Sequence, residues 1–305
     1  MIGTRMTRIT QIFTDFLFYK TKKSAQIRQI RVIRVPINLN PHLLQLCEEN
    51  AFSLPKILKD LKNKPIIDVI IPAYDEEKSI PFVLKDIPKD WVRDIIVCNN
   101  ASTDRTAEVA AANGATVVNQ PLRGYGNACL AGMAHIAAKA EKPDIVVFLD
   151  GDYSDHPEEL PSLIYPIWGS DTEGVTQNSK LKPQNYDMVI GSRATGVRES
   201  GSMTPQQVFG NWLATFLIRL LYGYRFTDLG PFRAIRYDKL LEINMIDKNY
   251  GWTVEMQIKA AKKKMRCTEV PMTYRRRIGV SKVSGTLKGT IMAGYKIILT
   301  IFRYL

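Results

Sequence analysis

Short apolar runs alternate with helical patterns along the chain from residue 64 onward. The run IIDVIIPAY at residues 66–74 is rich in β-branched residues and is followed by the acidic cluster DEEKS, which predicts a buried strand, a loop and a helix start. The run DIIVCNN at residues 94–100 leads through the polar turn ASTDRT into an alanine-rich helix, and DIVVFLDGDYSD at residues 144–155 predicts a further buried strand. This alternation predicts βαβ units, and therefore an α/β fold with a mostly parallel sheet flanked by helices.

Polar clusters follow these predicted strands. Because ligands of open α/β sheets bind beyond the carboxyl ends of the strands, we expect the clusters to meet at one site. The sharpest cluster is Asp150-Gly151-Asp152, in which two carboxylates flank a residue that leaves room for a ligand. Such a pair can hold Mg²⁺ or Mn²⁺, which prefer oxygen ligands and bridge to substrate phosphates, although surface turns also produce this triplet.

Two further segments carry groups that suit phosphate oxygens. Arg123 precedes the Gly124-Tyr125-Gly126 turn, which either brings backbone and guanidinium groups to a phosphate or has a structural role alone. The segment YRRRIGVSKVSGT at residues 274–286 gathers cations among glycine and serine. This composition suits either a diphosphate leaving group or a solvated loop.

The composition of the 305 residues is that of a globular protein, with 45% hydrophobic and 24% charged side chains. No run of about 18 apolar residues without charge occurs, so we expect no conventional transmembrane helix. The four cysteines lie far apart without a CxxC pair. This spacing indicates reduced thiols, a cytoplasmic compartment and no zinc site.

The net charge of +12 is concentrated near the N-terminus. Residues 1–64 contain 12 Lys and Arg against 4 Asp and Glu, a net charge of +8, whereas the rest of the chain contains 30 and 26, a net charge of +4. We interpret residues 1–64 as a basic extension outside the catalytic fold, which suits an anionic membrane surface; a solvated tail is the alternative. The basic residues lack the interleaved aromatics of a nucleic-acid-binding module, so we expect no nucleic-acid partner.

Two segments repeat apolar residues at helical spacing. The stripe within residues 209–221 is more typical of a core face than of a membrane face. In residues 287–305 an apolar face adjoins a stripe formed by Lys288, Lys296 and Arg303. This pattern predicts an amphipathic helix that lies either in a membrane interface or against the domain.

Taken together, the motifs resemble those of one enzyme family. DVIIPAYDEEKSI, NNASTDRT, FLDGDYSDHPEE, GSR, DLGPFR and EVPMTYRRRIGVSKVSG occur in the order found in family 2 glycosyltransferases with the Rossmann-like GT-A fold. Within that family the chain is most similar to the polyprenyl-phosphate (dolichol-phosphate) mannose and glucose synthases, over about residues 66–286. We therefore divide the chain into the extension at 1–64, a glycosyltransferase domain at 65–286 and an amphipathic helix at 287–305.

The resemblance implies roles for individual residues. The residues expected to bind the nucleotide sugar are Pro72, Tyr74, Glu76, Asn100, Asp104, Arg123, Gly124, Asp150, Arg276, Arg277 and Lys282. Those expected to act in catalysis are Asp152, Asp228, Glu255 and Arg193, with Asp150 and Asp152 as the metal ligands. Glu255 stands near the place where many relatives keep a catalytic base.

Two departures from the family pattern concern the substrates. Most relatives have a pair of aspartates where this chain has Asn99-Asn100, so their base preference does not carry over, because an amide both donates and accepts. Relatives often place an arginine near the acceptor phosphate, where this chain has the neutral Gln206 and Gln207.

The resemblance implies an inverting transfer of a hexose from a UDP- or GDP-hexose, in which the metal and the basic loop stabilise the departing diphosphate. A polyprenyl phosphate acceptor needs no general base, and such an enzyme is expected to lie peripherally on the cytoplasmic face of the membrane. The alternative is a soluble transferase that acts on a hydroxyl of a saccharide or small molecule, with Glu255 or Asp228 as base. An inactive binding module is disfavoured because Asp150, Asp152 and the basic loop are all present.

Overall fold

The computed structural model describes residues 64–168, 185–279 and 287–305, and within the last range it describes side chains from residue 292 onward. Nearly all of the basic extension, together with Lys282 and the side chain of Lys288, lies outside the described residues. The predictions made for them stay predictions.

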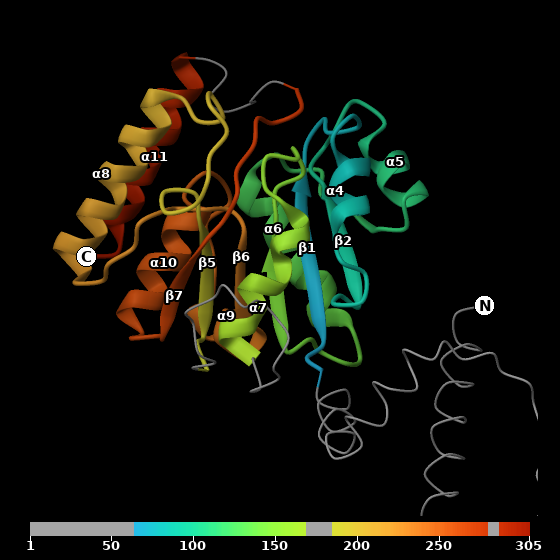
Figure 1. The fold of residues 1–305 in the computed structure, drawn as a ribbon, viewed down its shortest axis with the longest axis horizontal. Coiled ribbons are helices and arrows are strands. Elements are labelled where there is room, and N and C mark those ends of the chain that lie inside the picture. The colour runs from blue at the N-terminus through green and yellow to red at the C-terminus, as the bar shows by residue number, and fades with distance from the viewer. Residues whose placement is uncertain (1–63, 169–184, 280–286) are drawn as a thin grey trace, which may run out of the picture. The chain divides into compact units, whose positions relative to one another are not determined.

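A sheet of seven strands forms the centre of the described fold, in the order β3-β2-β1-β4-β6-β5-β7 (Figure 1). The strands are β1 Ile67–Ala73, β2 Asp94–Asn99, β3 Thr116–Asn119, β4 Ile145–Phe148, β5 Met188–Ser192, β6 Arg233–Arg236 and β7 Cys267–Pro271. Strand β6 runs antiparallel to both of its neighbours, and every other pairing is parallel. The prediction of an α/β fold with a mostly parallel sheet is confirmed.

Helices cover both faces of this sheet (Figure 1). They are α4 Ile80–Asp86, α5 Thr106–Ala112, α6 Tyr125–Ala138, α7 Leu160–Trp168, α8 Pro205–Tyr222, α9 Tyr237–Ile243, α10 Trp252–Lys262 and α11 Leu287–Arg303. Strand β1 is buried on both faces because Ile70 packs into the core on the side of α6 and α10, whereas Val69 and Ile71 pack on the side of α4 and α7. Continuous burial of this kind explains why the parallel strands appear in the sequence as predominantly apolar runs, although β1 also contains the buried Asp68.

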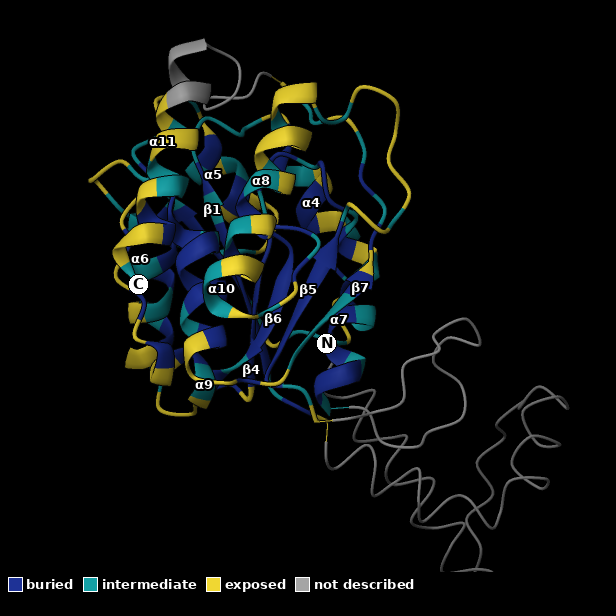
Figure 2. Ribbon diagram, turned by 90° about the vertical axis from the view of Figure 1, so that its left-hand side faces the viewer, coloured by how far each residue is buried: buried dark blue, intermediate teal, exposed yellow. Residues whose placement is uncertain are grey.

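Helix α8 begins and ends at clear signals. The side chain of Thr204 accepts a hydrogen bond from the backbone of Gln207, whose side chain in turn accepts one from Thr204, and Gly223 ends the helix with a φ of 69°. The prediction that the apolar stripe of residues 209–221 is a core face is wrong. Phe209, Trp212, Phe216 and Leu220 are exposed, and the other members of the stripe, Leu213, Leu217 and Leu221, are half-buried. The core face of α8 is formed by Ala214, Thr215 and Ile218, and exposed turns of this helix are yellow in Figure 2.

Helix α11 docks on the domain beside α8 and α10 (Figure 1). Ile301 is fully buried, and its carbonyl oxygen accepts a hydrogen bond from the hydroxyl of Tyr222. The opposite face exposes apolar side chains that include Met292, Tyr295 and Phe302. Helix α11 thus both packs against the domain and exposes an apolar face, whereas the sequence pattern predicted one or the other. In the described part of the chain, no helix combines the length and the hydrophobicity needed to cross a bilayer.

Candidate active site

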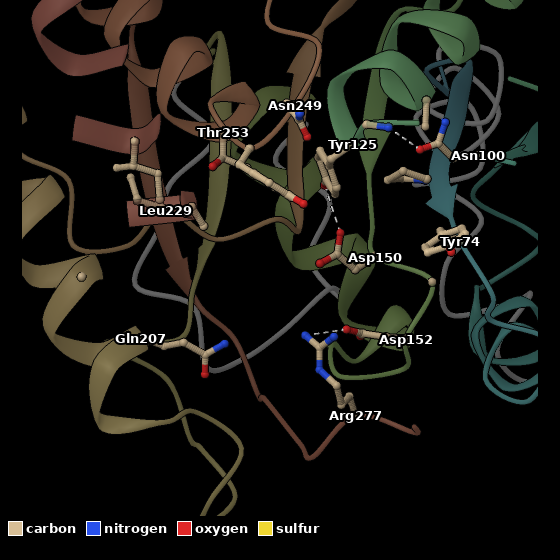
Figure 3. Close-up of a pocket in the computed structure, with 18 of the residues that line it drawn as sticks. Tyr74, Asn100, Tyr125, Asp150, Asp152, Gln207, Leu229, Asn249, Thr253 and Arg277 are labelled. Carbon is tan, nitrogen blue, oxygen red and sulfur yellow. Dashed lines mark hydrogen bonds and ion pairs between the residues drawn. The ribbon is translucent and has the colours of Figure 1, made fainter. Parts of the chain in front are cut away.

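A cavity of about 620 Å³ opens at the carboxyl ends of β1, β2 and β4 (Figure 3). Helices α8 and α11 close its other side. Of the residues predicted for the nucleotide sugar and for catalysis, those that line the cavity are Pro72, Tyr74, Glu76, Asn100, Arg123, Gly124, Asp150, Asp152, Arg193 and Arg277. Residues from separate strand ends therefore meet at one site, as the pattern of polar clusters predicted.

Two carboxylates stand at the end of β4, on the wall of this cavity. Asp150 accepts a hydrogen bond of 3.0 Å from the hydroxyl of Tyr125, and Asp152 forms an ion pair of 2.9 Å with Arg277 (Figure 3). Burial, and secondarily the negative charge of Asp152, raises the pKa of Asp150 to about 6. Burial alone would lower the pKa of Arg277, but the acidic groups around it, Asp152 foremost, together outweigh burial and raise that pKa.

The carboxylate pair fits a divalent cation. Two neighbouring carboxylates supply the oxygen donors that Mg²⁺ and Mn²⁺ prefer, and a cation there would relieve the repulsion between their negative charges. Among the described residues, no group of three or more Asp, Glu, His or Cys side chains could enclose a metal ion. Mg²⁺ and Mn²⁺ commonly complete such a pair of carboxylates with substrate phosphates and water.

The basic segment after β7 is attached to the carboxylate loop through its backbone. The amide of Arg275 donates to the carbonyl of Ser154 at 2.9 Å, and the amide of Ile278 donates to the carbonyl of Asp152 at 3.0 Å. These bonds place Arg277 in the cavity. They leave Arg276 outside it, 63% exposed and 3.6 Å from Glu199. The two neighbouring arginines thus have different surroundings, which the sequence did not distinguish.

Asn100 organises the turn that carries Arg123. Its side-chain oxygen accepts from the amide of Gly124 at 2.7 Å, and its nitrogen donates to the carbonyl of Leu122 at 2.7 Å. The guanidinium of Arg123 lies 4.5 Å from the ring centre of Tyr74, at the cavity rim. The amide of Asn100 therefore both donates and accepts within the protein, a pairing that an aspartate could not make.

Glycine is required where this turn passes the loop before α10. Gly124 has a φ of 138°, and a Cβ on it would lie 2.2 Å from the carbonyl oxygen of Lys248. A Cβ on Gly126 would lie 2.0 Å from the carbonyl oxygen of Asp247. The turn therefore has a packing role, whatever it binds.

Glu255 is not at the cavity. Its carboxylate is fully buried and accepts hydrogen bonds from the backbone amide of Asp247 at 2.7 Å and from the hydroxyl of Tyr304 at 2.7 Å. It also forms an ion pair of 2.7 Å with Lys259. The structure thus uses Glu255 to connect α10 to the preceding loop and to the end of α11, and it does not place this side chain where the expected base would act.

Asp228 and Asp104 also have structural partners. Asp228 is buried and receives three hydrogen bonds from Arg193, one from the backbone amide and two from the guanidinium, at 2.7–2.8 Å. Arg193 lines the cavity, whereas Asp228 lies behind it. Asp104 accepts from the amide of Thr106 at the start of α5 and from the amide of Glu77, and it does not line the cavity.

Several lining residues were not singled out from the sequence. Tyr125, which donates to Asp150, lies within the glycine turn and could have been found there. The loop before α10, the first turn of α10 and the inner side of α11 contribute residues that belong to no recognisable motif: Asn249, Tyr250, Thr253, Ala293, Gly294 and Ile297. Asp155 lies near the carboxylate pair; burial, and then the charge of Asp150, raises its pKa well above the usual range.

Comparisons with known proteins indicate the family to which the chain belongs. The sequence profile described as Glycosyl transferase family 2 matches residues 68–243. An uncharacterised glycosyltransferase of Mycobacterium tuberculosis is 33% identical over 229 residues, which cover 74% of this chain and 94% of the relative. Undecaprenyl-phosphate mannosyltransferase of Micrococcus luteus is 30% identical over 233 residues, which cover 72% of this chain and 88% of the relative.

The fold is also found among solved structures. Glucosyl-3-phosphoglycerate synthase from Mycobacterium tuberculosis, solved in complex with Mn²⁺, uridine-diphosphate-glucose and phosphoglyceric acid, superposes with a TM-score of 0.60. The match covers 80% of each chain at 23% sequence identity, so it shows a shared fold and nothing further. The profile match and the relatives at 30% identity or more carry the assignment further: the chain is a glycosyltransferase and belongs to glycosyl transferase family 2.

Proposed function

We propose that this glycosyltransferase moves a hexose from a UDP- or GDP-hexose to a polyprenyl phosphate at the membrane surface, with inversion at the anomeric carbon. The observation that carries the proposal is the position of the carboxylates. Glu255 and Asp228, the two candidate bases, are both bound to structural partners away from the cavity. A phosphate acceptor suits this site because it is already ionised near neutral pH and needs no base.

The donor would bind along the strand ends. Tyr74 and Arg123 offer an aromatic face and a cation at the β1 side for the nucleoside, and Arg277 lies beside the carboxylate pair for the diphosphate. Mg²⁺ or Mn²⁺ bound by Asp150 and Asp152 would stabilise the charge of the departing diphosphate. The guanidinium of Arg277 would do the same from the protein side.

Arg193 is suited to the acceptor phosphate. Its Nε and Nη2 atoms donate to Asp228, and its guanidinium lies 5.1 Å from the ring centre of Tyr274, so its position at the cavity wall is fixed. The bidentate pair leaves Nη1 for an anionic ligand. The name of the Micrococcus luteus relative, an undecaprenyl-phosphate mannosyltransferase, supports an acceptor of this class.

Peripheral attachment to the cytoplasmic membrane face is part of the proposal. The exposed apolar face of α11 would lie in the interface, and the basic extension at residues 1–64 would add electrostatic attraction. Such attachment is moderate in strength and sensitive to salt.

A soluble transferase with a hydroxyl acceptor is the second candidate. It is motivated by the phosphoglyceric acid in the structure of glucosyl-3-phosphoglycerate synthase, which has the same fold. In this chain such a reaction would need a base other than Glu255, and among the described lining residues the remaining carboxylates are Glu76, Asp150 and Asp152.

A donor and acceptor panel tests the proposal. UDP- and GDP-hexoses are incubated with a short-chain polyprenyl phosphate or with phosphoglyceric acid, in the presence of Mg²⁺ or Mn²⁺, and glycosylated product is measured. We expect transfer to the polyprenyl phosphate, abolished by excess EDTA. Transfer to phosphoglyceric acid alone would establish the second candidate, and full activity in EDTA would refute the metal assignment.

A further inference from the structure

A second cavity of about 340 Å³ adjoins the first along α8. Met203 and Asn211 line both cavities, so the two are neighbours. Apolar side chains form much of the second cavity's wall, among them Trp212, Phe216 and Phe226. None of the predicted site residues except Asp228 contributes to it, and the carboxylate of Asp228 is occupied by Arg193.

The outer side of this cavity continues into a ridge of aromatic rings on α8. The ring centres of Phe209 and Trp212 are 5.8 Å apart, and those of Trp212 and Phe216 are 5.7 Å apart. Trp212 is 57% exposed and Phe209 61%, and Leu220 continues the exposed line one turn beyond Phe216. Contiguous exposed aromatic surface on a globular domain marks a contact with a partner or a membrane.

Three arginines border the same cavity. Arg198, Arg219 and Arg225 are exposed, and in the described part of the chain none of them forms an ion pair with a carboxylate. The guanidinium of Arg198 donates a hydrogen bond to the sulfur of Met203 at 3.7 Å. A cluster of uncompensated guanidinium groups beside exposed tryptophan and phenylalanine matches an anionic phospholipid surface, where phosphates meet the acyl chains.

We propose that this face of α8, formed by the aromatic ridge and the three arginines, docks on an anionic phospholipid bilayer. This inference rests on the proposed function, and it adds the surface through which the enzyme would contact the membrane. Docking here would bring the neighbouring catalytic cavity to the surface that holds a lipid-phosphate acceptor. The aromatic rings would enter the headgroup region, while the second cavity would receive lipid phosphates between its arginines.

A bilayer explains the charges better than a second copy of the chain does. A twofold contact between two copies of this face would bring both sets of arginines together, and like charges across an interface are unfavourable. Anionic headgroups would compensate the same arginines.

Vesicle co-sedimentation of the full chain tests the docking face, with phosphatidylcholine vesicles prepared with and without phosphatidylglycerol. Arg219→Gln/Arg225→Gln should weaken binding to the anionic vesicles roughly thirtyfold at low salt. Trp212→Ser/Phe216→Ser should weaken it roughly tenfold or more. The matched controls are Lys78→Gln/Lys85→Gln, which removes the same charge from exposed sites near α4, and Leu241→Ser on α9. Both controls should bind like the parent protein.

The outcomes separate this inference from the function on which it rests. All variants should transfer hexose to a water-soluble short-chain polyprenyl phosphate as the parent protein does, because none of the substituted residues lines the catalytic cavity. Unchanged vesicle binding by the α8 variants would overturn the docking face, as would an equal loss in the lysine control. A parent dimer that the α8 variants dissociate, seen by sedimentation velocity, would assign the face to a second copy instead. If the parent protein fails to glycosylate any lipid phosphate, the proposed acceptor is wrong, while the vesicle result still decides the docking face.

Discussion

Replacing Glu255 by glutamine separates a structural role from a catalytic one. The substitution keeps the size of the side chain and one acceptor oxygen, but it removes the charge that faces Lys259 at 2.7 Å. The second oxygen becomes an amide nitrogen, so the backbone amide of Asp247 or the hydroxyl of Tyr304 loses its acceptor. The folded state should therefore become less stable without any change at the catalytic cavity.

The size of the effect follows from these contacts. Removing one partner of a buried ion pair costs about 3–5 kcal/mol, but Lys259 keeps a hydrogen bond to the carbonyl of Asn244 and its position over the ring of Tyr304. We therefore expect a loss of about 2–4 kcal/mol in the free energy of unfolding, or a fall in Tm of roughly 5–15 °C. The matched control, Tyr304→Phe, removes one hydrogen bond to the same carboxylate and should cost about 1 kcal/mol.

The assay combines thermal denaturation with initial rates measured well below the transition of the variant. Glu255→Gln should lower Tm and retain a turnover number within a few-fold of the parent protein. An inactive variant with an unchanged Tm that still binds the donor would refute this reasoning. It would restore Glu255 as the base of a hydroxyl-transferring enzyme.

Five further substitutions test the cavity and its surroundings. Asp152→Asn should fold normally and lose activity roughly a hundredfold or more, measured with saturating Mn²⁺; full activity would exclude it as a metal ligand. Arg277→Ala should lower turnover more than it weakens donor binding, whereas Arg276→Ala should leave turnover within about threefold; equal effects would contradict their different positions. Gly126→Ala should lower Tm because its Cβ would lie 2.0 Å from a carbonyl oxygen, whereas Gly210→Ala, with open space around it inside α8, should raise Tm or leave it unchanged.

The parts of the site that follow parallel strands were predictable from the sequence. A buried parallel strand gives an unbroken apolar run, and the polar residues after it lie at the edge where ligands bind. Asn100 and the pair Asp150 and Asp152 were found by this rule, and all three line the cavity. Their positions depend on local order along the chain and on strand direction.

The positions of Glu255 and Asp228 away from the cavity could not be predicted, for the opposite reason. Whether a carboxylate faces a cavity or a neighbouring cation depends on contacts that are distant in sequence. Tyr304 lies 49 residues from Glu255, and Arg193 lies 35 residues from Asp228. The order of motifs along the chain carries no information on such partners. For the same reason it could not predict that α11 forms part of the cavity wall.

Helix α8 shows why a hydrophobic stripe on its own does not identify its partner. Its periodicity is that of any amphipathic helix, and the inner side does pack into the core through Ala214 and Ile218. The apolar surface is wider than this contact, so Trp212 and its aromatic neighbours remain exposed. The same helix lines the catalytic cavity with Gly210 and Asn211. If α8 docks on a bilayer as we propose, the surface that recruits the acceptor and the wall that receives it belong to one rigid element, and no separate motion is needed to bring them together.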